Sequence, residues 1–366
     1  MKTNQTLIGD CRETLKQIPA NFVQTCITSP PYWGLRDYGT ATWEGGDSNC
    51  DHKVGRETRG GLSDKQKTTK GSFGDEAIKN NQPCPKCGAI RKDSQLGLED
   101  TPEEYVESMV AVFREVKRVL RDDGTVWLNL GDSYAMTSLR GGDKPHSGNV
   151  GAHKHYDNNH SISRATKKIP LGIKPKDLVG IPWRVAFALQ ADGWYLRQDI
   201  IWHKPNPMPE SVQDRCTKDH EYIFLLSKNK KYYCDMDSIR EPVKESNKGF
   251  IVARARTASG ALGGENKHNM ERRDYKEIKG ANKRSVWTVT TKPFKEAHFA
   301  TFPVDLITPC VLAGSGKGDV VLDPFMGSGT TAMVAQDLGR HWLGCELNEE
   351  YTDMQKKRTA QQKFNL

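Results

Sequence analysis

The amino-acid sequence predicts an α/β protein with a doubly wound, mainly parallel sheet and polar insertions. Two observations support this fold class. Apolar segments of strand length alternate with helical patterns near both ends of the 366-residue chain, and this alternation is typical of parallel strands joined by helical crossovers. Only 36% of the residues are hydrophobic and the mean hydropathy is −0.70, so long segments are expected to lie outside the core.

The first expected elements lie within residues 5–28. "TLIGD" predicts a short strand, "CRETLKQIP" a helix or turn, and "FVQTCIT" a buried strand. Residues 40–95 interrupt this pattern, because they are rich in Gly, Lys, Asp and Thr and show little apolar periodicity. We expect them to form an inserted loop region.

The clearest helix is expected over residues 101–120. Thr101 suits the N-cap, Pro102 suits the first helical position, and Glu104 completes a capping box. Apolar residues recur at steps of three and four, which gives the helix one buried face. "DDG" is expected to stop it at Gly124, before the strand "TVWLNLGD".

The second half of the chain contains two further groups of elements. "GIPWRVAFALQADGW" predicts a helix, and "YLRQDIIWHKP" and "HEYIFLLSKN" predict strands. After a basic block at residues 246–292, "FPVDLITPCVLAGS" predicts a helix and "DVVLDPF" a strand. The glycine turn and helix "GSGTTAMVAQDLG" and the strand "RHWLGCEL" complete the alternation.

Charge and cysteine content restrict the class of protein. The net charge of +8 is compatible with a polyanionic partner. No apolar run reaches the length of a membrane span, and the first ten residues lack the apolar core of a signal peptide, so we expect a cytoplasmic protein without a membrane partner. The nine scattered cysteines favour thiols or metal ligands over disulfides.

The segment "VVLDPFMGSGTTAMVAQDLGRHWLGCEL" predicts a ligand site at a glycine turn between two strands. Gly327 and Gly329 let the backbone approach a ligand closely, and Glu346 ends the next strand, where a carboxylate can accept both hydroxyls of a ribose. A dinucleotide fits imperfectly because Ala332 replaces the third glycine of its motif. A nucleoside triphosphate is rejected because Gly318 replaces the Ser or Thr of "GK[ST]" in "AGSGKGD".

S-adenosylmethionine fits this segment best, because it carries no phosphate and needs a tight turn beneath its methionine part. Asp323, the turn from Gly327 to Gly329, and Glu346 provide such a turn and a carboxylate for the ribose. A plain strand–helix turn without a ligand is the alternative.

A second unusual turn, "TSPPYW", directly follows the strand "FVQTCIT". Pro30 and Pro31 donate no backbone N–H and keep the chain stiff. Beside a methyl donor, Ser29 Oγ and the Pro30 carbonyl could accept the two hydrogens of an exocyclic base amine and free its conjugated lone pair. Tyr32 could then stack on the base, with Trp33 as its neighbour, and a base reached in this way has left the duplex.

These motifs make the sequence resemble the β-class amino-methylating DNA methyltransferases, in which a (D/N/S)PP(Y/F) motif precedes the cofactor motif. The resemblance implies a seven-stranded Rossmann-like methyltransferase sheet, double-stranded DNA as substrate, and a role in restriction-modification. The residues that match its catalytic motif are Ser29, Pro30, Pro31 and Tyr32, and those that match its cofactor motif are Asp323, Pro324, Phe325, Gly327, Ser328, Gly329 and Thr330.

Two shorter segments extend this resemblance. "LIGDC" is similar to the family's cofactor-side motif, which implies that Asp10 lies near the adenine of the donor. "FATFPVDLITPCVLAGS" is similar to the helix before the cofactor strand, which implies that Phe302 and Pro303 line the methionine end.

The serine of the catalytic motif favours cytosine N4 as the target, because this family associates SPPY with cytosine N4 and DPPY with adenine N6. Adenine N6 is therefore the alternative target. A cysteine nucleophile for carbon-5 methylation is not expected, since Cys26 and Cys310 both lie in apolar patterns. Alternatives of other classes are an inactive, zinc-containing DNA-binding protein and an enzyme acting on RNA or protein amines.

The insertion at residues 40–95 contains a candidate metal site. "QPCPKCGA" supplies Cys84 and Cys87 as a CxxC knuckle, and "NCDH" supplies Cys50 and His52. Together they form a Cys3His set suited to structural Zn²⁺, which would staple an insertion that lacks a core. Free thiols in a loop are the alternative.

Four parts are expected in the chain. Residues 1–39 and 96–245 form the catalytic part of the core, 40–95 the inserted loop with the zinc knuckle, 246–292 the DNA target-recognition region, and 293–366 the cofactor-binding part.

The recognition region holds eleven Lys and Arg residues against four acidic ones, so we expect it to contact DNA, with a disordered linker as the alternative. A homodimer is a further partner that the sequence leaves open. The candidates for reading guanine edges are Arg254, Arg256, Arg272 and Arg273.

Overall fold

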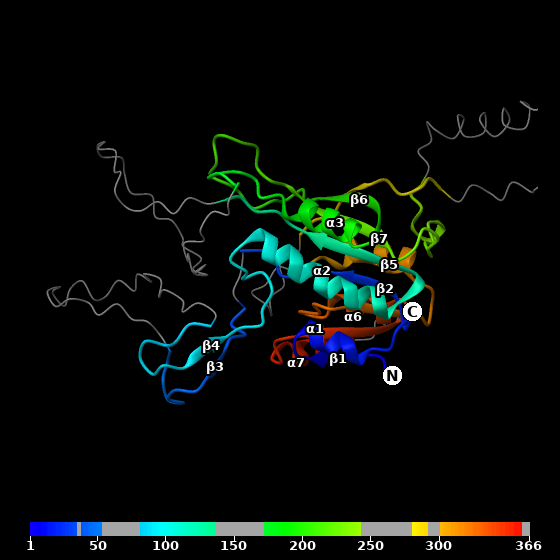
Figure 1. Cartoon of the computed structure of the whole chain (residues 1–366). Coiled ribbons are helices and arrows are strands. Elements are labelled where there is room, and N and C mark those ends of the chain that lie inside the picture. The colour runs from blue at the N-terminus through cyan, green and yellow to red at the C-terminus, as the bar shows by residue number, and fades with distance from the viewer. Residues whose placement is uncertain (35–37, 53–80, 136–171, 243–279, 292–300, 361–366) are drawn as a thin grey trace, which may run out of the picture.

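One sheet with helices on both faces forms the body of the computed structural model (Figure 1). The residues that the structure describes are 1–34, 38–52, 81–135, 172–242, 280–291 and 301–360. In sheet order the strands are β1 (Gln5–Ile8), β10 (His341–Glu346), β9 (Val320–Asp323), β2 (Val23–Thr28), β5 (Leu120–Leu130), β7 (His220–Ser227), β6 (Tyr195–His203) and β8 (Val286–Thr288).

This order confirms the predicted doubly wound, mainly parallel sheet. Strands β1, β10, β9, β2 and β5 run parallel, whereas β7 is antiparallel to both β5 and β6. β8 pairs with β6, so the described residues give this sheet eight strands, one more than expected. Because β8 has only three residues and lies in the basic block, it leaves no recognisable period-2 pattern in the sequence.

Strands from the two ends of the chain pair with each other in the sheet. β9 pairs with β2 through Leu322 and Cys26, and β1 pairs with β10 through Ile8 and Glu346. Figure 1 accordingly shows blue N-terminal elements beside orange and red C-terminal ones. The chain continues from β9 to β10 on one side and from β2 to β5 on the other, so the strand order reverses between β9 and β2. Ligands of such sheets bind at this switch point, beyond the carboxyl ends of the strands.

Two apolar cores hold helices against opposite faces of the sheet. Helices α1 (Cys11–Thr14), α2 (Pro102–Val119) and α3 (Ile181–Ala191) pack on one face, and α5 (Val304–Gly314) and α6 (Thr330–Asp337) pack on the other. Trp127 and Leu128, successive residues of β5, belong to different cores because side chains alternate along a strand. None of the described helices is both long and apolar enough to cross a membrane.

The predicted capping box of α2 is confirmed. The Glu104 backbone N–H donates to Thr101 Oγ1 at 3.2 Å, and the Thr101 N–H donates to the Glu104 carboxylate at 3.2 Å. The helix ends at Val119, before the expected stop at Gly124, because Leu120 is already extended and begins β5.

Besides β8, three elements of the described residues carry no clear signal in the sequence. The strands β3 (Thr42–Glu44) and β4 (Ile90–Lys92) form a small antiparallel ribbon inside the insertion. Helix α7 (Tyr351–Ala360) follows β10 and is mostly polar, so the sequence shows no apolar stripe from which this helix could be predicted.

Candidate active site

A cavity of about 590 Å³ lies at the switch point of the sheet. Its volume is within the range of small-molecule sites, and both of the turns selected from the sequence line it. The predicted site residues in its lining are Asp10, Ser29, Pro30, Pro31, Tyr32, Phe302, Asp323, Pro324, Phe325, Gly327, Ser328, Thr330 and Glu346. Pro303 and Gly329 are not in the lining; they are the N-caps of α5 and α6.

The proline turn leaves the carboxyl end of β2 and is supported from behind. The Tyr105 hydroxyl of α2 donates to the Pro31 carbonyl at 3.0 Å. Gly97 passes so close that a Cβ atom there would lie 3.0 Å from the Tyr32 carbonyl oxygen. These contacts, together with two prolines, fix the backbone of the turn where it faces the cavity.

The Tyr32 hydroxyl joins the turn to the neighbouring strands. It lies 2.8 Å from Glu221 Oε2 and 3.0 Å from Asn129 Oδ1, the two acceptors for its single proton. Ser29 Oγ donates to the same hydroxyl at 3.3 Å, so the lone pairs of Ser29 stay available as acceptors. Burial, and then the Glu221 carboxylate, raise the pKa of Tyr32 well above its ordinary value, so the phenol stays neutral.

Three residues of this network were missed by the sequence analysis. Asn129 Nδ2 donates to Glu221 Oε2 at 3.2 Å, and Lys204 Nζ forms an ion pair with Glu221 Oε1. Lys204 also lies over the Trp202 ring, 4.3 Å from its centroid. Polar residues at strand ends were the available signal, but their convergence depends on β5, β6 and β7 being neighbours.

Asp323 joins the glycine turn to the strand that carries the proline turn. Thr28 Oγ1 donates to its Oδ1 at 2.7 Å, and Thr331 Oγ1 donates to its Oδ2 at 2.6 Å. Burial raises the pKa of Asp323 to about 6, although these hydrogen bonds act in the opposite direction. Because Thr28 immediately precedes Ser29, this carboxylate fixes the relative position of the two turns.

Glu346 presents its carboxylate at the end of β10. The Gly327 N–H donates to Oε2 at 2.7 Å and the Asn348 N–H donates to Oε1 at 2.9 Å, so two backbone amides set its orientation. Burial raises the pKa of Glu346 to about 7 against the effect of these amides. Gly327 has a φ of 50°, in the left-handed region that glycine adopts without steric cost.

The other cofactor candidates surround this turn. Asp10 caps α1, accepts the Arg12 backbone N–H at 2.8 Å and forms an ion pair with the Arg12 guanidinium. Arg358 of α7 donates to Ser328 Oγ at 2.6 Å and to Thr330 Oγ1 at 3.0 Å. Contacts of Asp10 and of these hydroxyls with a cofactor stay predictions.

Several predicted residues lie outside the cavity. Trp33 is buried in the core and its Nε1 donates to the Glu99 carbonyl at 3.0 Å, a position that counts against a direct contact with DNA. Cys26 and Cys310 are buried, in agreement with core thiols. The arginines predicted to read bases, all outside the described residues, are Arg254, Arg256, Arg272 and Arg273.

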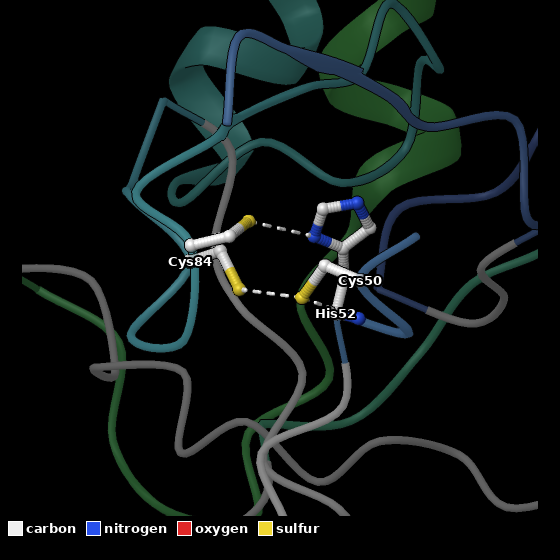
Figure 2. Close-up of side chains that lie close together, drawn as sticks. Cys50, His52 and Cys84 are labelled. Atoms are coloured by element: carbon white, nitrogen blue, oxygen red, sulfur yellow. Dashed lines mark hydrogen bonds between the residues drawn. The ribbon is translucent and has the colours of Figure 1, made fainter. Parts of the chain in front are cut away.

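The predicted metal ligands come together away from the cavity. Figure 2 shows the side chains of Cys50, His52 and Cys84 pointing toward one another. With Cys87, their ligand atoms all lie within 4.8 Å of one another. None of the four residues lines the cavity of the two turns.

Comparison with known proteins gives similarity along nearly the whole chain. The family model described as DNA methylase, of the N6/N4 type, matches residues 23–357. Type II methyltransferase M.Cfr9I of Citrobacter freundii is 39% identical over 359 residues, which cover 98% of this chain and 88% of that protein. Type II methyltransferase M.SmaI of Serratia marcescens is also 39% identical, with 98% and 91% covered.

Solved structures share the same fold at low sequence identity. The cytosine-N4-specific PvuII DNA methyltransferase aligns with a TM-score of 0.55 at 15% identity and covers 100% of this chain and 89% of its own. A putative DNA modification methylase of Thermus thermophilus, in complex with S-adenosyl-L-methionine, aligns with a TM-score of 0.50 at 20% identity and covers 98% and 94%. These structures support the Rossmann-like sheet.

Proposed function

Because the chain belongs to the DNA methylase family of the N6/N4 type, we propose that it transfers a methyl group from S-adenosylmethionine to the exocyclic N4 of cytosine in double-stranded DNA. The observation that carries this proposal is the shared cavity. It places the serine–proline turn of the N-terminal part beside the glycine turn of the C-terminal part. A methyl acceptor and a methyl donor bound to these turns would face each other.

The residues at the ends of β9 and β10 fit the cofactor. The tight turn at Gly327 leaves room for the methionine part, and the Glu346 carboxylate is oriented to accept the two ribose hydroxyls. Asp323 holds the turn in place through Thr28 and Thr331. When bound, the cofactor supplies an electrophilic methyl group on a positively charged sulfur.

The proline turn supplies acceptors for the target amine. The lone pair of an exocyclic base amine is conjugated into the ring, so the nitrogen attacks poorly unless its geometry changes. Ser29 Oγ and the Pro30 carbonyl would accept its two N–H groups and hold the nitrogen in line with the methyl group. The N–CH3 bond would form as the S–CH3 bond breaks, and the nitrogen would then lose one of its two protons to solvent. Because the Ser29 hydroxyl donates its hydrogen bond to the Tyr32 hydroxyl, the lone pairs of the Ser29 oxygen are left to accept from the amine.

The target base has to leave the duplex to reach this turn. The Tyr32 ring lines the cavity and is fixed through its hydroxyl, so it is suited to stack on the displaced base. Ser29 in the first position of the motif supports cytosine N4 over adenine N6 as the target.

Nucleoside analysis tests the proposed reaction. DNA incubated with the protein and isotope-labelled S-adenosylmethionine is expected to yield labelled 4-methylcytosine after digestion, as measured by mass spectrometry. Labelled 6-methyladenine would instead show that adenine N6 is the target. DNA binding without label transfer would favour an inactive DNA-binding protein, and label in competing RNA or polypeptide would reject DNA as the substrate.

Gly131→Ala tests the role of Tyr32. A Cβ atom at Gly131 would lie 2.5 Å from Tyr32 Cε2, so the ring must shift from the position in which its hydroxyl contacts Glu221 and Asn129. We expect turnover to fall about 10-fold or more through this misplacement, with the Kd of S-adenosylmethionine unchanged. Gly316→Ala is the control, because Gly316 lies outside the cavity and the new Cβ would come no closer than 3.3 Å to a neighbouring atom. Unchanged turnover in Gly131→Ala would remove Tyr32 from the proposed mechanism.

We also propose that Cys50, His52, Cys84 and Cys87 hold a structural Zn²⁺, because three thiolates and one imidazole form a closed tetrahedral set. A DNA substrate is in keeping with the cytoplasmic location expected from the sequence.

A further inference from the structure

The Cys3His cluster has the dimensions of a tetrahedral metal site. Cys50 Sγ and Cys84 Sγ lie 3.9 Å apart, and Cys87 Sγ lies 3.6 Å from His52 Nδ1. With Zn–S near 2.3 Å and Zn–N near 2.0 Å, a tetrahedron separates two sulfurs by about 3.8 Å and a sulfur from a nitrogen by about 3.5 Å. These two pairs therefore already lie near the separations that the ion would impose, and all four ligand atoms lie within 4.8 Å of one another.

The backbone around the cluster is shaped to present these ligands. In the Cys84–Cys87 knuckle, the Gly88 N–H donates to the Cys84 carbonyl at 2.8 Å. His52 has a φ of 51°, a left-handed conformation that costs energy in a residue other than glycine. Its ring stacks on Trp43 of β3, with centroids 4.0 Å apart and planes 11° apart. The histidine ring is therefore held in one orientation, and the energetic cost of its left-handed backbone conformation has to be offset by other interactions.

The described part of the insertion has too little core to hold this arrangement without help. Among the described residues between 40 and 95, only Cys84, Ala89 and Gln95 are buried. Its ribbon consists of two strands of three residues each. Small units of this kind usually depend on a metal or a disulfide for their structure.

The two arms that meet at the cluster also form one wall of the methyl-transfer cavity. Cys50 and His52 follow β3, Cys84 and Cys87 precede β4, and the ribbon pairs Trp43 with Arg91. The residues of these arms that line the cavity are Tyr38, Thr40, Ser94, Gln95 and Leu96. A force that holds the arms together at the cluster therefore acts on the wall.

Partly buried polar contacts connect the ribbon to that wall. Arg91 pairs at 2.8 Å with Asp93, whose side chain is only 1% exposed, and Asp93 Oδ1 accepts from Thr40 Oγ1 at 3.0 Å. Gln95 Oε1 accepts the Tyr38 N–H at 2.7 Å, which joins one arm to the other directly at the cavity. The Gln95 N–H donates to Asp93 Oδ1 at 3.0 Å. The register of the ribbon thus sets the position of the cavity wall.

We infer that Zn²⁺ in the Cys3His cluster positions this wall and thereby sets the shape of the methyl-transfer cavity. The effect on turnover rests on the proposed function, whereas metal binding does not. With four protein ligands the ion has no open position, so it takes no part in the chemistry. The four ligands are positioning residues that act through Asp93, Gln95 and Tyr38.

The first test measures the metal itself in the full chain. Elemental analysis of the purified protein is expected to give one Zn²⁺ per chain, and Cys84→Ser with Cys87→Ser is expected to abolish it. Cys216→Ser is the matched control, since Cys216 is exposed and outside the cluster, and it should keep the metal. A chain that holds no Zn²⁺ and takes up none when Zn²⁺ is added overturns the inference, whatever its activity on DNA.

The second test measures the wall. Removal of Zn²⁺ by a chelator is expected to raise hydrogen–deuterium exchange in residues 38–44 and 89–97, and to leave α2 and β5 protected. Turnover should fall about 10- to 100-fold and return on adding Zn²⁺ back, because displaced cavity residues misalign the substrates. If loss of Zn²⁺ changes neither hydrogen–deuterium exchange in these residues nor turnover, the inference that the ion positions the cavity wall is overturned. If the loaded protein methylates no DNA, the proposed function fails, and the exchange result still decides the inference.

Discussion

Ser29→Ala is expected to lower the turnover number by about 100-fold or more and to leave the Kd of S-adenosylmethionine unchanged. The variant removes an acceptor that would grip the amine only as it becomes tetrahedral, so the loss falls on the transition state. The fold should survive, because Tyr32 keeps Glu221 and Asn129 as partners. Single-turnover label transfer and calorimetric titration of the cofactor measure the two quantities.

Ser238→Ala provides the control for this variant. Ser238 lies outside the cavity and its hydroxyl donates only to the local Asp235 carbonyl, at 2.8 Å, among the described residues. It should methylate at the wild-type rate. Parallel losses of turnover and cofactor affinity in Ser29→Ala would contradict the role of Ser29 as an acceptor for the amine.

Glu346→Gln is expected to weaken S-adenosylmethionine binding by about 10- to 100-fold, the usual effect of losing hydrogen bonds to a charged group. It should also remove a pH dependence. Burial raises the pKa of Glu346 to about 7, so in the wild type the carboxyl is increasingly neutral below that pH and charged above it. Because the charged form accepts the ribose hydroxyls more strongly, wild-type affinity should rise as pH rises through 7.

Glu349→Gln is the matched control, since Glu349 is exposed and lies three residues beyond Glu346 outside the cavity. Its cofactor affinity should follow the wild-type pH profile. A Glu346→Gln variant with the same profile as the wild type would show that another group binds the ribose or that the cofactor lies elsewhere.

The site residues that lie at the ends of strands can be predicted from the sequence. Ser29, Asp323 and Glu346 each follow or end an apolar segment, and the carboxyl ends of adjacent parallel strands meet at one edge of a sheet. The capping box at Thr101 is likewise local, because its two hydrogen bonds join residues three apart. Such features can be predicted without knowledge of the tertiary contacts.

The remaining features depend on contacts that are distant in sequence. Glu221 is the second residue of β7 and reaches the cavity only because β7 runs antiparallel to β5, which places the amino end of β7 beside the carboxyl end of β5. Trp33 follows Tyr32 directly, but the turn directs it into the core, where Glu99 accepts its N–H. β8 and α7 have no clear period of their own and depend on packing against the finished sheet.

The central claim is that one cavity holds the target amine and the methyl donor together. The most direct measurement is a crystal structure with S-adenosylhomocysteine and a duplex containing the target, whose sequence can be found by sequencing methylated DNA. The account predicts a cytosine outside the stack, with N4 between Ser29 Oγ and the Pro30 carbonyl and facing the cofactor sulfur above Gly327. A cofactor bound outside this cavity, or a target base held away from Ser29, would contradict it.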